Sequence, residues 1–337
     1  MGRQWAAAAC ALLLAAGCSG GSGSSDDPLA EPANRSGAGG GNGAGSQASG
    51  SQASDGKAGS YQPAIVLGTV RDPAISESSG LAASRRNPGM LWTHNDSGDK
   101  PLVFCLDLQA RSCGVWLVTG ADAFDWEDMA AGPGPRAGQP YLYLGDIGDN
   151  IDQRTEIVVY RIPEPTAPGG DVDGTLVSPA STAPAEALRF KYPDGPHNAE
   201  ALLVHPESGD LYIVSKDAQS AKVYKAAAPL EPAKVVTMVQ VGTIRLGTGP
   251  RGLETITGAD ISPDGRRVAL STYTQGYELE VPAGAVFDDV WAQRPVPVAL
   301  GARLQGEAVA YRLDGRALLT TSEIVPWSLQ QVERRAP

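Results

Sequence analysis

The chain has 337 residues, of which 42% are hydrophobic and 19% are charged, and its formal net charge is −11. This composition suits a globular protein with a substantial core, and it argues against a nucleic-acid-binding protein, which would need basic patches. Glycine and proline are abundant and aromatic residues are few, as expected of many short strands joined by turns.

Residues 1–18 are predicted to be an export signal, because one arginine and a short apolar run precede small residues and Cys18. The apolar run is too short to span a membrane. Ala15-Ala16-Gly17-Cys18 resembles the bacterial lipobox, in which the cysteine is lipidated and becomes the mature N-terminus. We therefore expect a protein of the cell envelope, outside the cytoplasm, attached to membrane lipid through Cys18. The alternative is an ordinary secretory signal with an incidental cysteine.

Residues 19–60 consist almost wholly of Gly, Ser, Ala, Asn, Gln and Asp. Such a segment cannot bury enough apolar surface to fold, so it is predicted to be a flexible tether. The globular domain is expected over residues 61–337, as a monomer held away from the membrane.

A predicted β-hairpin recurs five times along this domain. In the clearest copy, strands at Ala201–Val204 and Leu211–Ser215 flank a turn, with Glu200 at the entrance and Asp217 at the exit. The five entrances are Ser79, Glu127, Glu200, Thr257 and Glu307, and the five exits are Asp96, Asp146, Asp217, Thr274 and Glu323. The spacing within a hairpin is nearly constant whereas the spacing between hairpins varies, which is typical of a radial β-repeat.

Two further strand-like runs follow each hairpin, and four strands per repeat is the blade of a β-propeller. The last repeat lacks one strand, which Ala64–Val70 can supply by pairing with the Leu329–Val332 region and closing the ring. The predicted fold is therefore an all-β propeller of five four-stranded blades. Six blades remain an alternative if the Pro/Ala/Gly-rich insertion Pro163–Ala187 hides strands.

Cys105 and Cys113 fall on the third and fourth strands of the first repeat. Because an exported protein meets an oxidising compartment, a disulfide between them is expected. The alternative is two buried thiols.

The entrances and exits of the hairpins open on one face of a propeller, around its central channel. Seven of these ten positions carry a carboxylate, and such crowding costs stability unless a cation or a proton is shared. Oxygen ligands with scarcely any His or Cys indicate a hard ion such as Ca²⁺. The candidate metal ligands are Asp96, Glu127, Asp146, Asn150, Glu200 and Glu307.

Other polar residues beside these positions are candidates for chemistry or ligand contact. His94 and His197 are candidates for proton transfer. The candidate ligand contacts are Asn95, Asp149, Arg154 and Glu323. The alternative interpretation is that Asp-Asn-Gly clusters form turns at strand ends, and that a recurring Glu hydrogen-bonds the backbone of the next blade.

Several catalytic classes are excluded by missing motifs. The sequence has neither a G-x-S-x-G nucleophile elbow nor a Walker loop, and no Cys or His pair has zinc spacing. Three histidines in the whole chain also argue against a serine triad.

Some segments resemble known propellers. SPDGRRVAL resembles the hairpin of TolB-like and WD40-type propellers, and marks the fold alone. The runs SGLAAS, HNDSGD, DWEDMA, GDIGDN, PHNAEALLVHP, LYIVSK and ITGADISPDG resemble a group of uncharacterised secreted bacterial propeller proteins, over most of residues 77–323. The ring of Glu, Asp and Asn is also similar, in architecture, to the calcium-dependent gluconolactonase/paraoxonase-like propellers and the propeller phytases, although the lactonase blade motif is not reproduced.

Two functions of different classes follow. The first is a Ca²⁺-dependent hydrolase of an ester, lactone or phosphoester, with the ion as a Lewis acid near the channel mouth. The second is a non-catalytic, lipid-tethered propeller that binds a sugar, a peptide or an envelope protein.

Overall fold

The computed structural model describes residues 61–168, 179–218, 220–246, 254–324 and 326–335. The predicted export signal, Cys18 and the tether lie outside the described residues. Within the described ranges, no helix is long and apolar enough to cross a membrane.

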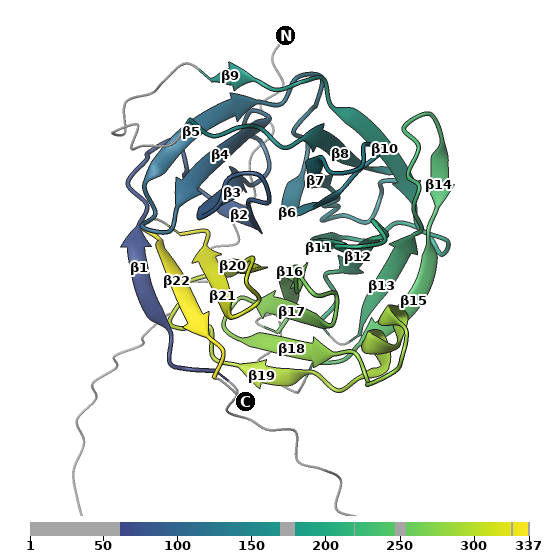
Figure 1. The fold of residues 1–337 in the computed structure, drawn as a ribbon. Helices are drawn as coiled ribbons and strands as arrows, with labels where there is room; N and C mark the ends of the chain where they lie inside the picture. The colour runs from purple at the N-terminus through teal and green to yellow at the C-terminus, as the bar shows by residue number, and fades with distance from the viewer. Residues whose placement is uncertain (1–60, 169–178, 219, 247–253, 325, 336–337) are drawn as a thin grey trace, which may run out of the picture. The chain divides into compact units, whose positions relative to one another are not determined.

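The described residues form five small sheets arranged as blades around a common axis, so the predicted five-bladed propeller is confirmed (Figure 1). Blade 1 consists of β2 (Ser78–Ala83), β3 (Met90–Asn95), β4 (Leu102–Asp107) and β5 (Ser112–Leu117). Blade 2 consists of β6 (Trp126–Pro133), β7 (Pro140–Asp146), β8 (Ile157–Pro163) and β10 (Glu186–Lys191). Blade 3 consists of β11 (Ala199–Val204), β12 (Leu211–Ser215), β13 (Ala221–Ala226) and β15 (Val239–Ile244).

Blade 4 consists of β16 (Ile256–Ile261), β17 (Arg267–Thr272), β18 (Gly276–Glu280) and β19 (Val296–Val298), with the short 3₁₀ helix η1 (Phe287–Ala292) before its last strand. Blade 5 consists of β20 (Gly306–Tyr311), β21 (Ala317–Ser322), β22 (Ser328–Glu333) and β1 (Ile65–Thr69). Two short strands, β9 (Ala180–Ser181) and β14 (Val235–Thr237), extend blades 1 and 2 at their outer edges. The insertion before β10 therefore contributes β9 to blade 1, and no sixth blade forms among the described residues.

The N-terminal strand closes the ring as predicted. β1 pairs antiparallel with β22, from Ile65 opposite Gln331 to Thr69 opposite Ser328, so blade 5 contains both ends of the described chain (Figure 1). Tyr61 extends this contact through a bridge to Arg334, and its hydroxyl donates to Glu278 Oε1 at 2.5 Å. This pairing gives blade 5 its fourth strand.

The core lies between adjacent blades, because each sheet packs one face on each neighbour. Every residue of β11 and of β20 is buried, as expected of inner strands that are covered on both faces. One hydrophobic cluster joins Tyr143 and Leu188 of blade 2 to Val204 and Ile213 of blade 3. The inner strands are thereby held rigidly around the channel.

The predicted disulfide is not present: Cys105 and Cys113 are not joined. The register of β4 with β5 breaks at this point, so Cys105 lies opposite Gly114 and Leu106 opposite Ser112. Cys113 is the extra residue of a bulge and does not lie directly opposite Cys105. Burial, and then the adjacent Cys113, raises the pKa of the Cys105 thiol.

Candidate functional site

Each inner strand breaks its register with the second strand at the same place. In blades 1 to 4 one residue of the inner strand has no partner residue on the second strand. In blade 5 two consecutive residues, Glu307 and Ala308, have none. The skipped residues are Ser79, Glu127, Glu200, Thr257 and Glu307. A bulge bends the strand and redirects its side chain. The five predicted entrances are therefore structurally equivalent and lie at the same end of the propeller axis, which we call the mouth.

The exits of the second strands differ from the prediction by one residue in three blades. The residues that pair just before each bulge are Asn95, Asp146, Ser215, Thr272 and Ser322, and the residues that follow them are Asp96, Ile147, Lys216, Tyr273 and Glu323. Because side chains alternate along a strand, a shift of one residue changes the face to which a side chain points. Lys216 and Tyr273 thus replace the predicted Asp217 and Thr274, and Asp146 lies one residue too early.

Three carboxylates converge at the mouth between blades 1 and 2. Asp96, Asp125 and Glu127 each place one oxygen so that all three lie within 4.8 Å of one another. Asp125 was not among the predicted ligands, although its spacing of two residues from Glu127 puts both side chains on one side of an extended segment. Gly148 makes room for them, since a Cβ there would collide with the carboxylates of Glu127 and Asp125.

The protonation of this cluster is displaced by burial and by mutual repulsion. Burial, and then the charge of Asp96, raises the pKa of Asp125 to about 6. Burial, and then Glu200, raises the pKa of Glu127 well above its usual value. Burial also raises the pKa of Asp96. Burial and mutual repulsion therefore disfavour the charged forms of the three groups, and a cation among them would favour those forms.

The other half of the mouth contains an internal cation. Lys216 forms an ion pair with Glu200 Oε1, and its ammonium lies 5.3 Å from the centre of the Tyr273 ring. Burial raises the pKa of Glu200 to about 7 although Lys216 acts against this. The second oxygen, Glu200 Oε2, is buried and has no hydrogen-bond partner among the described residues.

Glu307 and Glu323 complete this half. Burial, followed by the charge of Glu200, raises the pKa of Glu307 well above its usual value, and burial followed by Asp96 raises that of Glu323. Lys216 lowers the pKa of both carboxyls, as it does for Glu127 and Asp96. Lys216 is therefore the shared neighbour of the acids around the mouth, and sequence reasoning missed it because of the shifted register.

Asp146 and Arg154 support the loop that carries Asp125. Asp146 accepts hydrogen bonds from the backbone N–H groups of Phe124 and Asp125, both at 3.3 Å. Arg154 Nη1 lies 2.8 Å from Asp146 Oδ1 and donates to Gly148 O at 2.8 Å. The structure therefore gives Asp146 a positioning contact, outside the carboxylate cluster.

Three further predicted residues lie in loop contacts on this face. Asp149 is buried and accepts a hydrogen bond from the backbone N–H of Arg154 at 2.7 Å. Asn150 is exposed, and its Oδ1 accepts from Asn198 Nδ2 at 3.2 Å. Asn95 donates to Asp99 Oδ2 at 2.6 Å and so holds the loop after β3. These residues shape the loops, as the turn-former interpretation expects.

The two histidines do not belong to the carboxylate cluster. His94 is fully buried, its Nδ1 lies 2.8 Å from Asn95 O, and burial lowers its pKa to about 4. Its ring packs edge-on against Trp126, because both faces of blade 1 are covered by neighbouring blades. His197 lies 3.0 Å from Asp194 and stacks on Tyr224. The imidazole of His94 is therefore shielded from solvent, whereas that of His197 is held by Asp194 and Tyr224.

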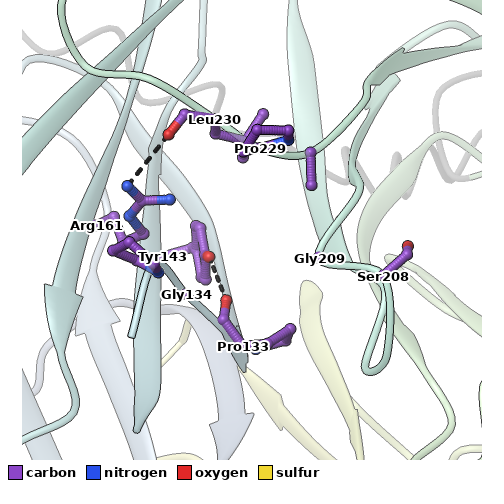
Figure 2. Close-up of a pocket in the computed structure, with 10 residues that line it drawn as sticks. Pro133, Gly134, Tyr143, Arg161, Ser208, Gly209, Pro229 and Leu230 are labelled. Atoms are coloured by element: carbon purple, nitrogen blue, oxygen red, sulfur yellow. Dashed lines mark hydrogen bonds between the residues drawn. The ribbon is translucent and has the colours of Figure 1, made fainter. Parts of the chain in front are cut away.

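A separate groove lies at the opposite end of blades 2 and 3 (Figure 2). It has a volume of about 390 Å³ and is lined by Pro133, Pro229 and Leu230 among others. Arg161 Nη2 donates to Leu230 O at 3.3 Å, and Tyr143 Oη donates to Pro133 O at 2.5 Å (Figure 2). Since Pro133 ends β6 whereas Glu127 lies near its beginning, this groove is not part of the acidic mouth.

No family model matches the sequence, and no curated protein matches it. The solved structures that are similar to the chain include three of low identity. A chain of a nidogen/laminin complex is 13% identical over 73% of each chain, with a TM-score of 0.39. Luciferin-regenerating enzyme is 12% identical over 80% of this chain and 95% of that one, with a TM-score of 0.41. Kuenenia stuttgartiensis hydrazine synthase is 14% identical over 76% of this chain and 58% of that one, with a TM-score of 0.37. Similarity at this level carries no argument about activity.

Proposed function

We propose that this protein is an exported, lipid-anchored propeller whose channel mouth binds a divalent cation, Ca²⁺. The observation that carries the proposal is the convergence of Asp96, Asp125 and Glu127, whose oxygens lie within 4.8 Å of one another. Carboxylates are preferred ligands of Ca²⁺, and the group contains neither the imidazole nor the thiolate that zinc favours.

Two features of the surroundings suit a cation at this place. Gly148 leaves the space that the two blade 2 carboxylates occupy. The pKa of each clustered acid is raised by burial, so a bound cation would replace protons and relieve the repulsion.

Calorimetric titration with Ca²⁺ and thermal unfolding test the proposal. Ca²⁺ is expected to raise the thermal midpoint because it binds the folded state, and a chelator is expected to reverse the shift. Asp125→Asn should remove the response, whereas Glu207→Gln, in the turn at the other end of β11, should keep it. A midpoint that is indifferent to Ca²⁺, to other divalent ions and to chelator contradicts the proposal.

For catalysis, we propose hydrolysis of an ester, lactone or phosphoester, in which bound Ca²⁺ supplies Lewis-acid polarisation. Glu200 is the group suited to proton transfer, since burial raises its pKa to about 7 and Lys216 fixes its other oxygen. His94 is less suited because burial lowers its pKa to about 4, which makes it a weak base at neutral pH.

Turnover of nitrophenyl acetate, a γ-lactone and nitrophenyl phosphate, each with Ca²⁺ and with chelator, tests the catalytic step. Glu200→Gln should lower kcat about 100-fold, the usual contribution of a general acid or base. Ca²⁺ binding without turnover of any class would favour the non-catalytic binding propeller instead.

A further inference from the structure

The loop that follows β7 lies directly against the carboxylate cluster. The backbone N–H groups of Ile147 and Gly148 both donate to Asp125 O at 3.2 Å. A Cβ at Gly148 would collide with the carboxylates of Asp125 and Glu127, so this part of the loop touches two of the three clustered acids. The position of the loop therefore helps to fix how the two acids are placed relative to each other and to Asp96.

Asn198 of blade 3 holds this loop from the other side. Its Oδ1 accepts a hydrogen bond from the backbone N–H of Asp149 at 2.8 Å, and its Nδ2 donates to Asn150 Oδ1 at 3.2 Å. Its backbone N–H donates to Asp152 Oδ1 at 3.0 Å. One residue of blade 3 is thus joined to the loop of blade 2 by several hydrogen bonds, and the shortest of them is made to the residue that follows Gly148.

Asn198 is also close to the second half of the mouth, because it lies two residues before Glu200. Its carbonyl oxygen accepts a hydrogen bond from the backbone N–H of Lys216 at 2.9 Å, and the pairing of Ala199 with Ser215 comes next. Glu200 is the bulge residue that follows, and its side chain forms the ion pair with Lys216. A displacement of Asn198 would therefore displace both members of this pair.

The amide side chain of Asn198 suits this place because it can accept a hydrogen bond and donate one at the same time. Replacement by alanine would remove both of its side-chain contacts with the loop. The contacts with Asp152 and Lys216 would remain, since they involve the backbone N–H and C=O groups of residue 198. Asn198→Ala therefore loosens the loop from β11 while the backbone hydrogen bonds of β11 are kept.

We propose that Asn198 is a positioning residue that couples the carboxylate cluster between blades 1 and 2 to the Glu200–Lys216 pair of blade 3. A cation bound in the cluster draws Asp125 and Glu127 together, the loop follows, and Asn198 transmits the displacement to the pair. By linkage, the state of the pair changes the affinity for the cation by the same factor. The proposal rests on the calcium binding proposed above, and it adds how that binding reaches the group proposed for proton transfer.

Calcium affinity, measured by calorimetry, tests the coupling. Asn198→Ala is expected to weaken Ca²⁺ binding about tenfold, the lower range for residues that hold metal ligands through hydrogen bonds. Should this variant not fold, Asn150→Ala removes one of the two side-chain contacts at an exposed position, and it should weaken binding in the same direction.

Asn87→Ala is the matched control for stability. Asn87 lies in the turn between β2 and β3, at the end of blade 1 opposite the mouth. Its side chain donates to Pro165 O at 3.0 Å and accepts a hydrogen bond from the backbone N–H of Ala167 at 2.9 Å. Asn87→Ala should lower the thermal midpoint and leave the Ca²⁺ affinity unchanged.

Hydrogen exchange of the Lys216 amide reports the coupling directly, since this N–H donates to Asn198 O. In the wild type, Ca²⁺ should slow its exchange about fivefold relative to chelator, the low end of couplings between sites. In Asn198→Ala, at a Ca²⁺ concentration that saturates the variant, this slowing should be lost. An asparagine that only stabilised the fold would change the exchange equally with and without Ca²⁺.

The outcomes separate this inference from the calcium proposal. Wild-type Ca²⁺ affinity in Asn198→Ala, or slowing of the Lys216 exchange that persists in the variant, overturns the inference and leaves the calcium site in place. An equal loss of affinity in Asn87→Ala would show that affinity follows stability alone, and it also overturns the inference. A wild type that does not bind Ca²⁺ removes the calcium proposal and the coupling with it.

Discussion

At the scale of single residues, Lys216 offsets part of the repulsion among the buried carboxylates of the mouth. Its ammonium contacts Glu200 and lowers the pKa of the carboxyls around it. Glu200 nevertheless has a pKa of about 7 in the folded state, against an ordinary value of 4.5. A carboxyl whose pKa is higher in the folded than in the unfolded state binds protons more readily in the folded state. Its contribution to the free energy of unfolding is therefore present at low pH and is lost as pH rises from about 4.5 to about 7.

Lys216→Met should therefore destabilise the protein in a pH-dependent way. At pH 8 the charge of Glu200 loses its partner, and we expect a loss of about 3 kcal/mol, the lower range for a broken buried pair. At pH 5 Glu200 is protonated and the loss should be much smaller. Chemical unfolding at both pH values, without divalent ions, measures the difference. Lys234→Met, in an exposed pair with Glu231, is the control, and an equal loss at both pH values would contradict the role given to Lys216.

The position of a residue could be predicted from the sequence where one strand was sufficient, and it could not where two strands had to be aligned. Glu127, Glu200 and Glu307 were identified from repeated hairpins alone, and each lies at a bulge. Lys216 was missed because the bulge adds a residue that no local pattern counts. The burial of His94 could not be predicted either. Both faces of a propeller blade are covered by neighbouring blades, so the alternation of side chains along a strand does not show which side chains are exposed to solvent.

At the scale of elements, Asp128 links the inner strands of three successive blades. It is fully buried on β6, and it accepts hydrogen bonds from three backbone N–H groups, those of Met129 at 2.8 Å, Leu202 at 3.0 Å and Ala259 at 3.2 Å. One carboxylate therefore joins the inner strands of blades 2, 3 and 4, which are β6, β11 and β16. The sequence showed Asp128 as one of several acids around Trp126, with no indication of this reach.

Asp128→Ala is expected to lower the free energy of unfolding by at least about 3 kcal/mol, since each buried N–H left without an acceptor costs about 1–3 kcal/mol. Asp289→Ala, at an exposed position of η1, should change it by less than about 0.5 kcal/mol. Urea unfolding of both variants measures the difference. Similar small losses for the two would mean that Asp128 does not hold the inner strands together.

At the scale of the whole molecule, ring closure is the feature that the sequence predicted most fully. The last repeat lacked one strand, and the apolar run Ala64–Val70 belonged to no other repeat. The sequence therefore predicted that the two pair, and β1 does pair with β22. This long-range pairing could be inferred because a closed ring of four-stranded blades needed one more strand, and only one strand-like segment was unassigned. The disulfide prediction was wrong because it depended on the register of β4 and β5, which a bulge shifts.

Deleting residues 19–72 should destabilise the propeller by several kcal/mol, on the order of the loss of a packed strand. Deleting residues 19–58 alone should be nearly neutral, because β1 and the contacts of Tyr61 are kept. Thermal or chemical unfolding of the two truncated proteins compares them. Equal stability would show that the pairing of β1 with β22 does not hold the ring closed.

The membrane attachment proposed for Cys18 is tested by location. Cys18→Ser should release the protein from the membrane fraction into the soluble extracytoplasmic fraction or the medium, because the thiol that carries the lipid is absent. Cell fractionation and immunoblotting measure the distribution, and Cys10→Ser within the same signal is the matched control. A Cys18→Ser protein that stays in the membrane fraction would rule out the lipid anchor.

The closure of blade 5 also has a mechanical consequence. If the chain is held at Cys18, any pull on the domain enters the fold at Tyr61, next to β1. The load then meets the Tyr61 bridge to Arg334 before it reaches the ladder between β1 and β22. A ladder loaded from one end opens pair by pair and resists less force than one sheared along its whole length. The strand that completes the ring would thus be the first to yield under tension, and force spectroscopy should record its release before the blades unfold.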